Sequence, residues 1–386
     1  MFRSPKPLSL CIPRCVIRQH FLQICEKYTH LHKNRIEDDD NEKYRKKKEN
    51  HEDYLQLHKS RGQHLLTNQR VLDSIVQKSD IKSTDTVLEI GPGTGNLTLK
   101  LLEVAKHVIA VEIDKRMIEI LNKRVAECGF EHKITVINKD ALKAEFSEFD
   151  LVVANIPYNI SSPLLAKLLF GSSTFRSATL LLQKEFARRL LANPGDSDYN
   201  RLAVNVKLVA DVQFVMDVSK RDFVPCPKVD SSVVMIFPKD DVPYKDLDEW
   251  GAFTKTCFTK KNKTLGATFK QKKKVMELYK LFNRRDLSEE EKSADGCSND
   301  RCNDKDGEVK EDCSDEEACD QLSGLDTGVS NFKDKIMAVL KSGGFDDKRP
   351  SKLPNTELLK LLLLFNQAGI YFYDQARPAD VEFLPN

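Results

Sequence analysis

Residues 88–96 read LEIGPGTGN, in which three glycines follow a short apolar run. Gly91, Gly93 and Gly95 allow the backbone to turn sharply and let a ligand approach where a Cβ atom would clash. Turns of this kind join the first strand of a nucleotide-binding sheet to its helix. The dinucleotide-binding pattern has its third glycine where this chain has Asn96. The stretch therefore predicts a strand, a ligand-binding turn and a helix, without identifying the ligand.

Short β-rich runs and helical patterns alternate around this turn, from Thr86 to about Pro238. The runs are TVLEIG, HVIAVEID, KITVINKD, FDLVVANIP, SATLLLQ and SSVVMIF, which begin at residues 86, 107, 133, 149, 177 and 231. Between the second and third runs, apolar side chains recur at helical spacing up to Gly129, which can end that helix. Ser162 followed by Pro163 predicts another helix start. Repeated strand–helix–strand units predict a Rossmann-like, doubly wound, mostly parallel α/β sheet.

The domain organisation follows from where these patterns begin and end. Residues 56–238 are predicted to form the sheet domain, and residues 239–386 a smaller helical domain. Residues 1–55 are predicted to be a leader and a charged linker, because their second half is too charged to bury. The stretch from about residue 284 to residue 330 has the composition of a disordered acidic insert.

The net charge of +2 averages over two opposed blocks. Residues 255–274 hold eight lysines and no acid, whereas residues 284–320 hold fifteen acids against six bases. A lysine run without balancing acids is typical of a surface that contacts nucleic-acid phosphates, although a solvated helix face is the alternative. The predicted RNA contacts are Lys260, Lys261, Lys263, Lys270, Lys272 and Lys273.

The first 25 residues carry four basic side chains and no acid, and they lack a continuous apolar core. This profile is typical of an organellar transit peptide, with an unstructured tail as the alternative. The apolar runs are too short to predict a membrane span. Cys297, Cys302, Cys313 and Cys319 lack the paired short spacings of a zinc site, so no metal is predicted. Cys128, Cys226 and Cys257 are expected to be buried thiols.

Two acids follow successive strands beside the glycine turn. Glu112 ends the second run, at a reach suited to ribose hydroxyls, and Asp140 ends the third, where it can accept from an adenine amino group. No phosphate-binding lysine accompanies them. This combination favours S-adenosylmethionine over NAD or ATP, although the two acids could also simply end solvent-facing strands.

The fourth run leads into NIPY, residues 155–158. A turn explains Asn155 and Pro157, but it does not explain an aromatic side chain at the ligand-binding edge of a parallel sheet. Methylation of an adenine amino group supplies a reason for all of them. The Asn155 oxygen and the Ile156 carbonyl can accept the two N–H bonds, and Tyr158 can stack on a base that has left its helix.

Five motifs together resemble the ribosomal small-subunit adenine N6-dimethyltransferases, the KsgA/Dim family. They are GQHLL, EIGPGTGN, NIPYNISSP, LLQKEF and FVPCPKVDSSVV, and the match runs from about Lys59 to Phe237. The later stretches KKNKTLGATFKQK, GGFDDKR and FNQAGIYF resemble the eukaryotic branch. The resemblance implies a class I S-adenosylmethionine-dependent methyltransferase that dimethylates two adjacent adenosines near the 3′ end of small-subunit rRNA.

The same resemblance implies roles for individual residues. The cofactor would be bound by His64, Leu66, Gly91, Gly93, Glu112, Asp140 and Asn155. Asn155, Pro157 and Tyr158 would form the catalytic loop, with Phe223 as a second stacking face for the adenine. The expected partner is small-subunit rRNA or a pre-ribosomal small subunit, bound by a monomer without membrane or metal.

Three departures from the family pattern refine this assignment. His64 stands where bacterial members usually have asparagine, and Cys226 interrupts the usual run of prolines. Asn159 stands where nuclear members tend to have glutamine. With the basic leader, Asn159 makes the chain resemble the plant-type mitochondrial member and predicts a mitochondrial location, with the nucleolus as the alternative.

Three other functions remain open at this point. A non-catalytic RNA-binding, transcription or ribosome-assembly factor of the same family would share the fold, but the intact NIPY loop favours catalysis. A DNA adenine methylase would share the loop, but the lysine-rich second domain favours RNA. NAD-dependent redox chemistry has the least support.

Overall fold

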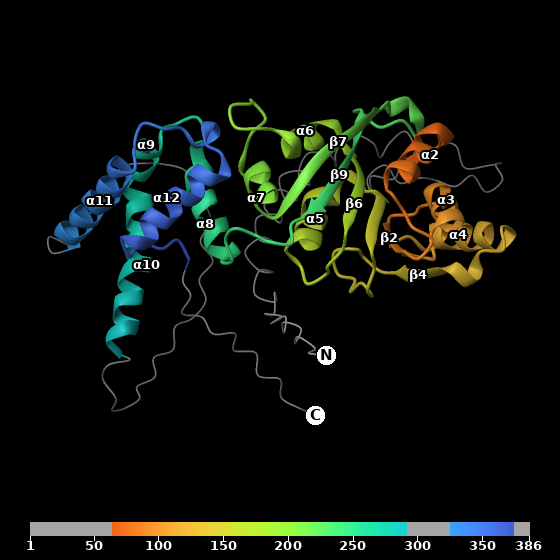
Figure 1. Cartoon of the computed structure of the whole chain (residues 1–386), viewed down its shortest axis with the longest axis horizontal. Helices are drawn as coiled ribbons and strands as arrows, with labels where there is room; N and C mark the ends of the chain where they lie inside the picture. Colours follow the sequence, from red (N-terminus) through yellow and green to blue (C-terminus); the bar gives the residue numbers. More distant parts are fainter. Residues whose placement is uncertain (1–63, 292–324, 374–386) are drawn as a thin grey trace, which may run out of the picture. The chain divides into compact units, whose positions relative to one another are not determined.

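A seven-stranded sheet forms the centre of the first part of the structure, a computed structural model that describes residues 64–291 and 325–373. The chain divides into two units, Met1–Gly251 and Ala252–Asn386, and the boundary falls within one helix. Figure 1 shows strands in the first unit and helices in the second. The expected leader and linker, residues 1–55, lie outside the described residues.

The elements of the first unit follow the predicted alternation. Its strands are β1 (Leu65–Leu66), β2 (Thr86–Ile90), β3 (His107–Glu112), β4 (Ile134–Asn138), β5 (Leu151–Asn155), β6 (Ser177–Gln183), β7 (Ala210–Val218), β8 (Phe223–Val224) and β9 (Ser231–Pro238). Its α-helices are α2 (Gln69–Lys78), α3 (Asn96–Val104), α4 (Lys115–Glu127), α5 (Ser161–Phe170), α6 (Lys184–Leu191) and α7 (Arg201–Val209). Short 3-10 turns are η3 (Glu131–Lys133), η4 (Tyr158–Ile160) and η5 (Lys220–Asp222).

The strand order confirms the doubly wound α/β fold. In the main sheet the order is β4-β3-β2-β5-β6-β9-β7, and β2 to β6 pair in parallel. Strand β9 runs antiparallel to both of its neighbours, and Figure 1 shows its long ladder with β7. The direction of winding reverses between β2 and β5. In open α/β sheets a ligand binds beside the carboxyl ends of the strands at this point.

Helices α2, α3 and α4 cover one face of the sheet because their apolar side chains recur once per turn. Leu72 of α2, Leu101 of α3 and Leu121 of α4 are fully buried in one cluster with alternate residues of the strands. On the strands this alternation is seen in Val108 and Ala110, which belong to the same cluster. This packing fixes the turn between β2 and α3 on a rigid support.

Three local features differ from what the sequence predicts. Strand β7 was not predicted, because its solvent-exposed edge position leaves it without a clear apolar alternation. Helix α5 begins at Ser161, so Pro163 is its third residue and Ser162 is not the N-cap. Cys128 and Cys226 are exposed, and only Cys257 of the three is buried.

The second unit is helical, as predicted. Its elements are α8 (Leu247–Cys257, which crosses the boundary), η6 (Phe258–Lys260), α9 (Leu265–Phe269), α10 (Lys272–Glu291), α11 (Leu325–Ser342), η7 (Pro350–Lys352) and α12 (Asn355–Gln367). Phe253, Phe269, Phe365 and Phe372 pack edge to face or tilted in its core. The structure differs from the predicted disordered insert of about 284–330 at both ends, where α10 and α11 are helical; residues 292–324 lie outside the described residues.

Two further features concern only the described ranges. None of their helices combines the length and apolarity needed to cross a bilayer. Within residues 64–291 and 325–373, no three or more His, Cys, Asp or Glu side chains are grouped so that they could hold a metal ion. The four cysteines between residues 297 and 319 lie outside these ranges.

Candidate functional site

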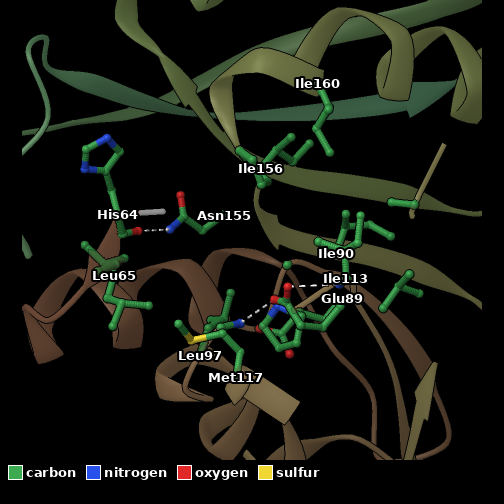
Figure 2. A pocket seen from close by; sticks show the side chains of 18 of the residues that line it. His64, Leu65, Glu89, Ile90, Leu97, Ile113, Met117, Asn155, Ile156 and Ile160 are labelled. Carbon is green, nitrogen blue, oxygen red and sulfur yellow. Dashed lines mark hydrogen bonds between the residues drawn. The ribbon is translucent and has the colours of Figure 1, made fainter. Parts of the chain in front are cut away.

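A pocket of about 510 Å³ lies at the carboxyl ends of β2, β3 and β5 (Figure 2). Its volume is within the usual range for cofactor sites. Its lining includes every residue that the sequence assigns to cofactor binding, together with Pro157 and Tyr158. Those cofactor residues are His64, Leu66, Gly91, Gly93, Glu112, Asp140 and Asn155. Residues far apart in the chain are therefore brought to one cavity.

The glycine turn forms the floor of the pocket in a conformation that side chains would obstruct. Gly93 has a φ of +56°, and a Cβ atom there would lie 2.8 Å from the Leu65 side chain. Its backbone N–H donates to Glu112 Oε2 at 3.2 Å. Asn96 replaces the third glycine of the dinucleotide pattern, and its Nδ2 donates to the Leu66 carbonyl at 2.8 Å. The departure at position 96 therefore ties the turn to β1.

Glu112 is held in place by the backbone. Its Oε1 accepts from the N–H groups of Ile113 and Asp114, both at 2.9 Å, while Oε2 accepts from Gly93. Its side chain is buried, and burial raises its pKa while the three N–H donors oppose that rise. The result is an oriented carboxylate at the pocket wall, whose remaining lone pairs can accept from ligand hydroxyls.

Asp140 lies in a turn that Lys167 clamps from α5. Asp140 Oδ1 accepts from Leu142 N at 2.9 Å, and its carbonyl accepts from Ala144 N at 2.8 Å. Lys167 Nζ donates to three carbonyls of the same turn, at Ala141, Leu142 and Ala144. The sequence reasoning missed Lys167, because a single lysine in an apolar helix carries no signal of its partner.

Glu89 is a pocket residue that the sequence reasoning also missed, although it lies inside the quoted glycine motif. Its side chain is 1% exposed, and its Oε2 has no hydrogen-bond partner among the described residues. Burial, with a further contribution from the charge of Glu112, raises its pKa to about 8. The carboxyl group is therefore mostly protonated at neutral pH and can donate a hydrogen bond into the pocket.

The raised pKa of Glu89 predicts how stability depends on pH. Between pH 4.5, its ordinary value, and about 8, the folded chain holds a proton that the unfolded chain releases. The free energy of unfolding should therefore fall as pH rises through this window, by up to about 1.4 kcal/mol per unit. A Glu89→Gln side chain cannot titrate. The difference in the free energy of unfolding, variant minus wild type, measured by urea unfolding, should therefore increase as pH rises. If the free energy of unfolding depended on pH in the same way in both proteins, the raised pKa of Glu89 would be contradicted.

Asn155 ends β5 with its amide oriented by the chain itself. Its Nδ2 donates to the His64 carbonyl at 3.2 Å, which Figure 2 shows. Among the described residues, Oδ1 has no hydrogen-bond donor and remains an acceptor at the half-buried pocket wall. Tyr158 follows on η4, and its hydroxyl is 2.7 Å from Ser231 Oγ. Burial raises the pKa of this hydroxyl, so Tyr158 stays neutral.

The front of the pocket is formed by β1, which pairs antiparallel with β8. Phe223 lies opposite Leu66 in this ladder; its side chain is 2% exposed and belongs to the hydrophobic cluster under the sheet. It is not among the residues that line the pocket. The expectation that Phe223 is a second stacking face therefore stays a prediction: its ring is buried in this structure, while its ladder partner Leu66 lines the pocket.

The predicted RNA-contacting lysines lie in the second unit. Lys260, Lys263, Lys270, Lys272 and Lys273 are exposed, and Lys261 is half-buried. They lie on η6, on the turns around α9 and at the start of α10. Hydrogen bonds from Leu265 N to the Lys348 carbonyl and from Gly266 N to the Asp346 carbonyl place the GGFDDKR loop beside them. Exposed Arg349 in that loop extends the basic surface.

Comparison with known families gives a match to the family model described as "Ribosomal RNA adenine dimethylase" over residues 54–303. This range includes the whole pocket and the lysine run. It covers more than half of the chain.

Individual relatives agree with the family match. The chain is 65% identical to the "Ribosomal RNA small subunit methyltransferase, mitochondrial" of Arabidopsis thaliana, over 83% of this chain and 82% of the relative. It is 44% identical to a "Probable dimethyladenosine transferase" of Dictyostelium discoideum, over 82% of this chain and 91% of the relative. Among solved structures, a dimethyladenosine transferase from Plasmodium falciparum matches with a TM-score of 0.66 and 39% identity, covering 80% of this chain and 100% of that one.

Proposed function

The chain belongs to the ribosomal RNA adenine dimethylase family, and from this premise we propose that it methylates small-subunit rRNA in the mitochondrion. The methyl groups come from S-adenosylmethionine and go to the N6 atoms of two adjacent adenosines near the 3′ end of that RNA. One observation carries the proposal: the free Asn155 acceptor and the Tyr158 ring line the same pocket as the oriented Glu112 carboxylate. The similarity to a mitochondrial relative supports the location.

The pocket residues fit S-adenosylmethionine. Glu112 presents oriented acceptors for ribose hydroxyls, and Asp140 presents an acceptor for an adenine amino group. A Cβ atom at Gly93 would lie 2.8 Å from the side chain of Leu65, which lines the same pocket, so glycine lets the turn and Leu65 keep their places in the lining. Glu89 adds a buried carboxyl oxygen without a partner among the described residues, which can bond to a polar group of the ligand. When bound, the cofactor supplies a methyl group that is already activated by its sulfonium.

Asn155 and Ile156 are proposed to orient the target amino group. An adenine N6 atom is a poor nucleophile because its lone pair is delocalised into the ring. Asn155 Oδ1 and the Ile156 carbonyl can accept its two N–H bonds and leave the lone pair pointing toward the methyl donor. Presetting the reacting atoms at about 3–3.5 Å accounts for much of the rate enhancement in such reactions.

Tyr158 is proposed to carry the adenine ring. A base must leave its helix to reach a pocket at the edge of a sheet. Stacking on an aromatic ring offsets that cost by about 1–3 kcal/mol. The hydrogen bond between the Tyr158 hydroxyl and Ser231 fixes the ring before the base arrives.

A direct assay tests the proposed function. The purified full-length chain is incubated with methyl-labelled S-adenosylmethionine and small-subunit RNA particles, and modified nucleosides are mapped by mass spectrometry. Dimethyladenosine at two adjacent positions near the 3′ end is expected. Methylation only at another base, or none with either free RNA or particles, would refute the proposal.

The exposed lysines of the second unit are proposed to contact RNA phosphates outside the pocket. None of Lys260, Lys263, Lys270, Lys272 and Lys273 forms an ion pair with a described residue. Their charges are therefore available to an external polyanion. If six to ten phosphates are contacted, affinity should fall about 10³–10⁵-fold between 50 and 200 mM salt.

Charge removal tests this surface. In a variant with Lys260, Lys263, Lys272 and Lys273 changed to alanine, RNA binding should depend less steeply on salt. The slope of log K for RNA binding against log salt concentration should become smaller in magnitude by roughly 0.7–0.9 for each phosphate contact removed. Affinity for S-adenosylmethionine should not change, because these lysines do not line the pocket. The matched control removes four exposed lysines of the first unit, Lys78, Lys82, Lys106 and Lys123. Equal salt slopes for the two variants would contradict the proposal.

A further inference from the structure

Lys167 of α5 holds the segment that carries Asp140. This segment, residues 139–150, links the edge strand β4 to β5 and contains no helix or strand. The Lys167 Nζ donates to three of its carbonyls, those of Ala141 at 2.7 Å, Leu142 at 3.2 Å and Ala144. An ammonium group has three N–H donors and no acceptor, so one side chain can bind all three carbonyls.

The surroundings of the ammonium group make these bonds hard to replace. Nζ lies 4.2 Å from the centroid of the Phe146 ring, which is a cation–π contact. The Phe146 ring in turn packs edge to face on Phe149, with centroids 6.3 Å apart. Ala141 and Ala144 are buried, so loss of the ammonium group would leave their carbonyls short of a donor.

The residues that Lys167 holds are also those that orient the Asp140 carboxylate. Asp140 Oδ1 accepts from the Leu142 N–H at 2.9 Å, and the Asp140 carbonyl accepts from the Ala144 N–H at 2.8 Å. Asp140 and Ala141 both line the pocket. A shift of the turn would therefore move the carboxylate within the pocket.

Helix α5 supports the substrate side of the pocket as well. It follows directly on η4, and Tyr158 and Ile160 of η4 line the pocket. Ser161, the first residue of α5, donates from Oγ to the Pro157 carbonyl at 3.5 Å. Lys167 follows Ser161 by less than two helical turns. One helix thus holds the proposed substrate loop at its start and the turn of Asp140 through Lys167.

We infer that Lys167 is a positioning residue that makes the cofactor site selective for adenine, because it holds the Asp140 carboxylate where the 6-amino group of the cofactor can donate to it. This inference rests on the proposed function and deepens it. A lysine that only stabilised the fold would affect all cofactor analogues alike. A lysine that orients Asp140 affects binding only of those that carry the amino group.

Lys207 provides a matched control. It is half-buried on α7, as Lys167 is on α5. Its Nζ donates to the carbonyls of Leu191, at 2.9 Å, and Ala192, at 2.6 Å, and to Asn193 Oδ1, at 2.8 Å. None of these residues lines the pocket. Lys167→Met and Lys207→Met therefore each remove one ammonium group that holds a turn, but only the first acts on the turn of Asp140.

The experiment measures the Kd of two ligands for the full-length chain by calorimetry. One is S-adenosylhomocysteine, and the other is its analogue with hydrogen in place of the 6-amino group. The wild type should bind the first about 10- to 100-fold more tightly, which is the value of one hydrogen bond to a charged group. In Lys167→Met this ratio should fall below about 3-fold, whereas Lys207→Met should keep the wild-type ratio. Urea unfolding should show both variants to be less stable than the wild type.

Lys167→Gln keeps one donor on a shorter side chain, so it serves as the second variant if Lys167→Met does not fold. Its ratio should lie between those of the wild type and Lys167→Met. The inference is overturned if a folded Lys167 variant keeps the wild-type ratio, if Lys207→Met loses it, or if the wild type binds both ligands equally. A wild type that is selective for the amino group but does not methylate RNA would refute the proposed function and leave this inference standing.

Discussion

Asn155→Ala should lower kcat for methyl transfer by at least about 10²–10³-fold, the usual cost of removing one oriented hydrogen-bonding group from a transition state. The reason is that Oδ1 is the side-chain acceptor proposed to fix the adenine amino group. S-adenosylmethionine should still bind, because Glu112 and Asp140 remain in place. The measurement is single-turnover methylation of small-subunit RNA, together with calorimetry of cofactor binding.

Asn122→Ala is the matched control for this prediction, because Asn122 is exposed on α4 and does not line the pocket. Its rate should equal that of the wild type. If Asn155→Ala retained full activity, the role assigned to Asn155 would be refuted. If it lost cofactor binding completely as well, cofactor binding, which the family resemblance also assigns to Asn155, would be its main contribution instead.

Glu112→Gln should weaken S-adenosylmethionine binding by roughly 10²-fold, equivalent to about 3 kcal/mol. A charged acceptor of ribose hydroxyls becomes a neutral amide. The amide also conflicts with its own surroundings, because three backbone N–H groups point at this side chain and an –NH₂ group cannot accept from them. The free energy of unfolding should therefore fall as well, by about 1–3 kcal/mol.

Calorimetry and urea unfolding check the two parts of this prediction. Glu119→Gln, at an exposed position of α4, is the control and should change neither quantity. An unchanged Kd in Glu112→Gln would exclude Glu112 as a cofactor ligand, whatever happened to stability. Reduced stability alone would leave it a structural residue of the glycine turn.

The parallel part of the sheet could be predicted because its signals are local. Each strand from β2 to β6 is a short, mostly apolar run, and Gly93 and Gly95 form the first turn with positive φ angles. In a parallel sheet, the carboxyl ends of neighbouring strands meet at one edge. Glu112, Asp140 and Asn155 therefore had to lie close together once the strand order was known.

The rest of the site depends on contacts that leave no local pattern. Strands β1 and β8 have two residues each and pair across more than 150 positions of sequence, so neither shows a periodicity. Only this pairing decides that Phe223 is buried and that His64 stacks on Tyr158. Glu89 was passed over for a related reason, since a charged residue in a strand normally faces solvent.

The β1–β8 ladder also sets the order in which the pocket can be completed during synthesis. A nascent chain that ends after β6 already contains the glycine turn, both strand-end carboxylates and Asn155. It still lacks Phe223 and Val224, the partners that hold Leu65 and Leu66 across the front of the cavity. Contacts of such large sequence separation form late and slowly, because the closure entropy of a long loop opposes them. A finished cavity is thus a property of the complete first unit, and a chain interrupted before β8 has the residues for chemistry without the enclosure that lets them act.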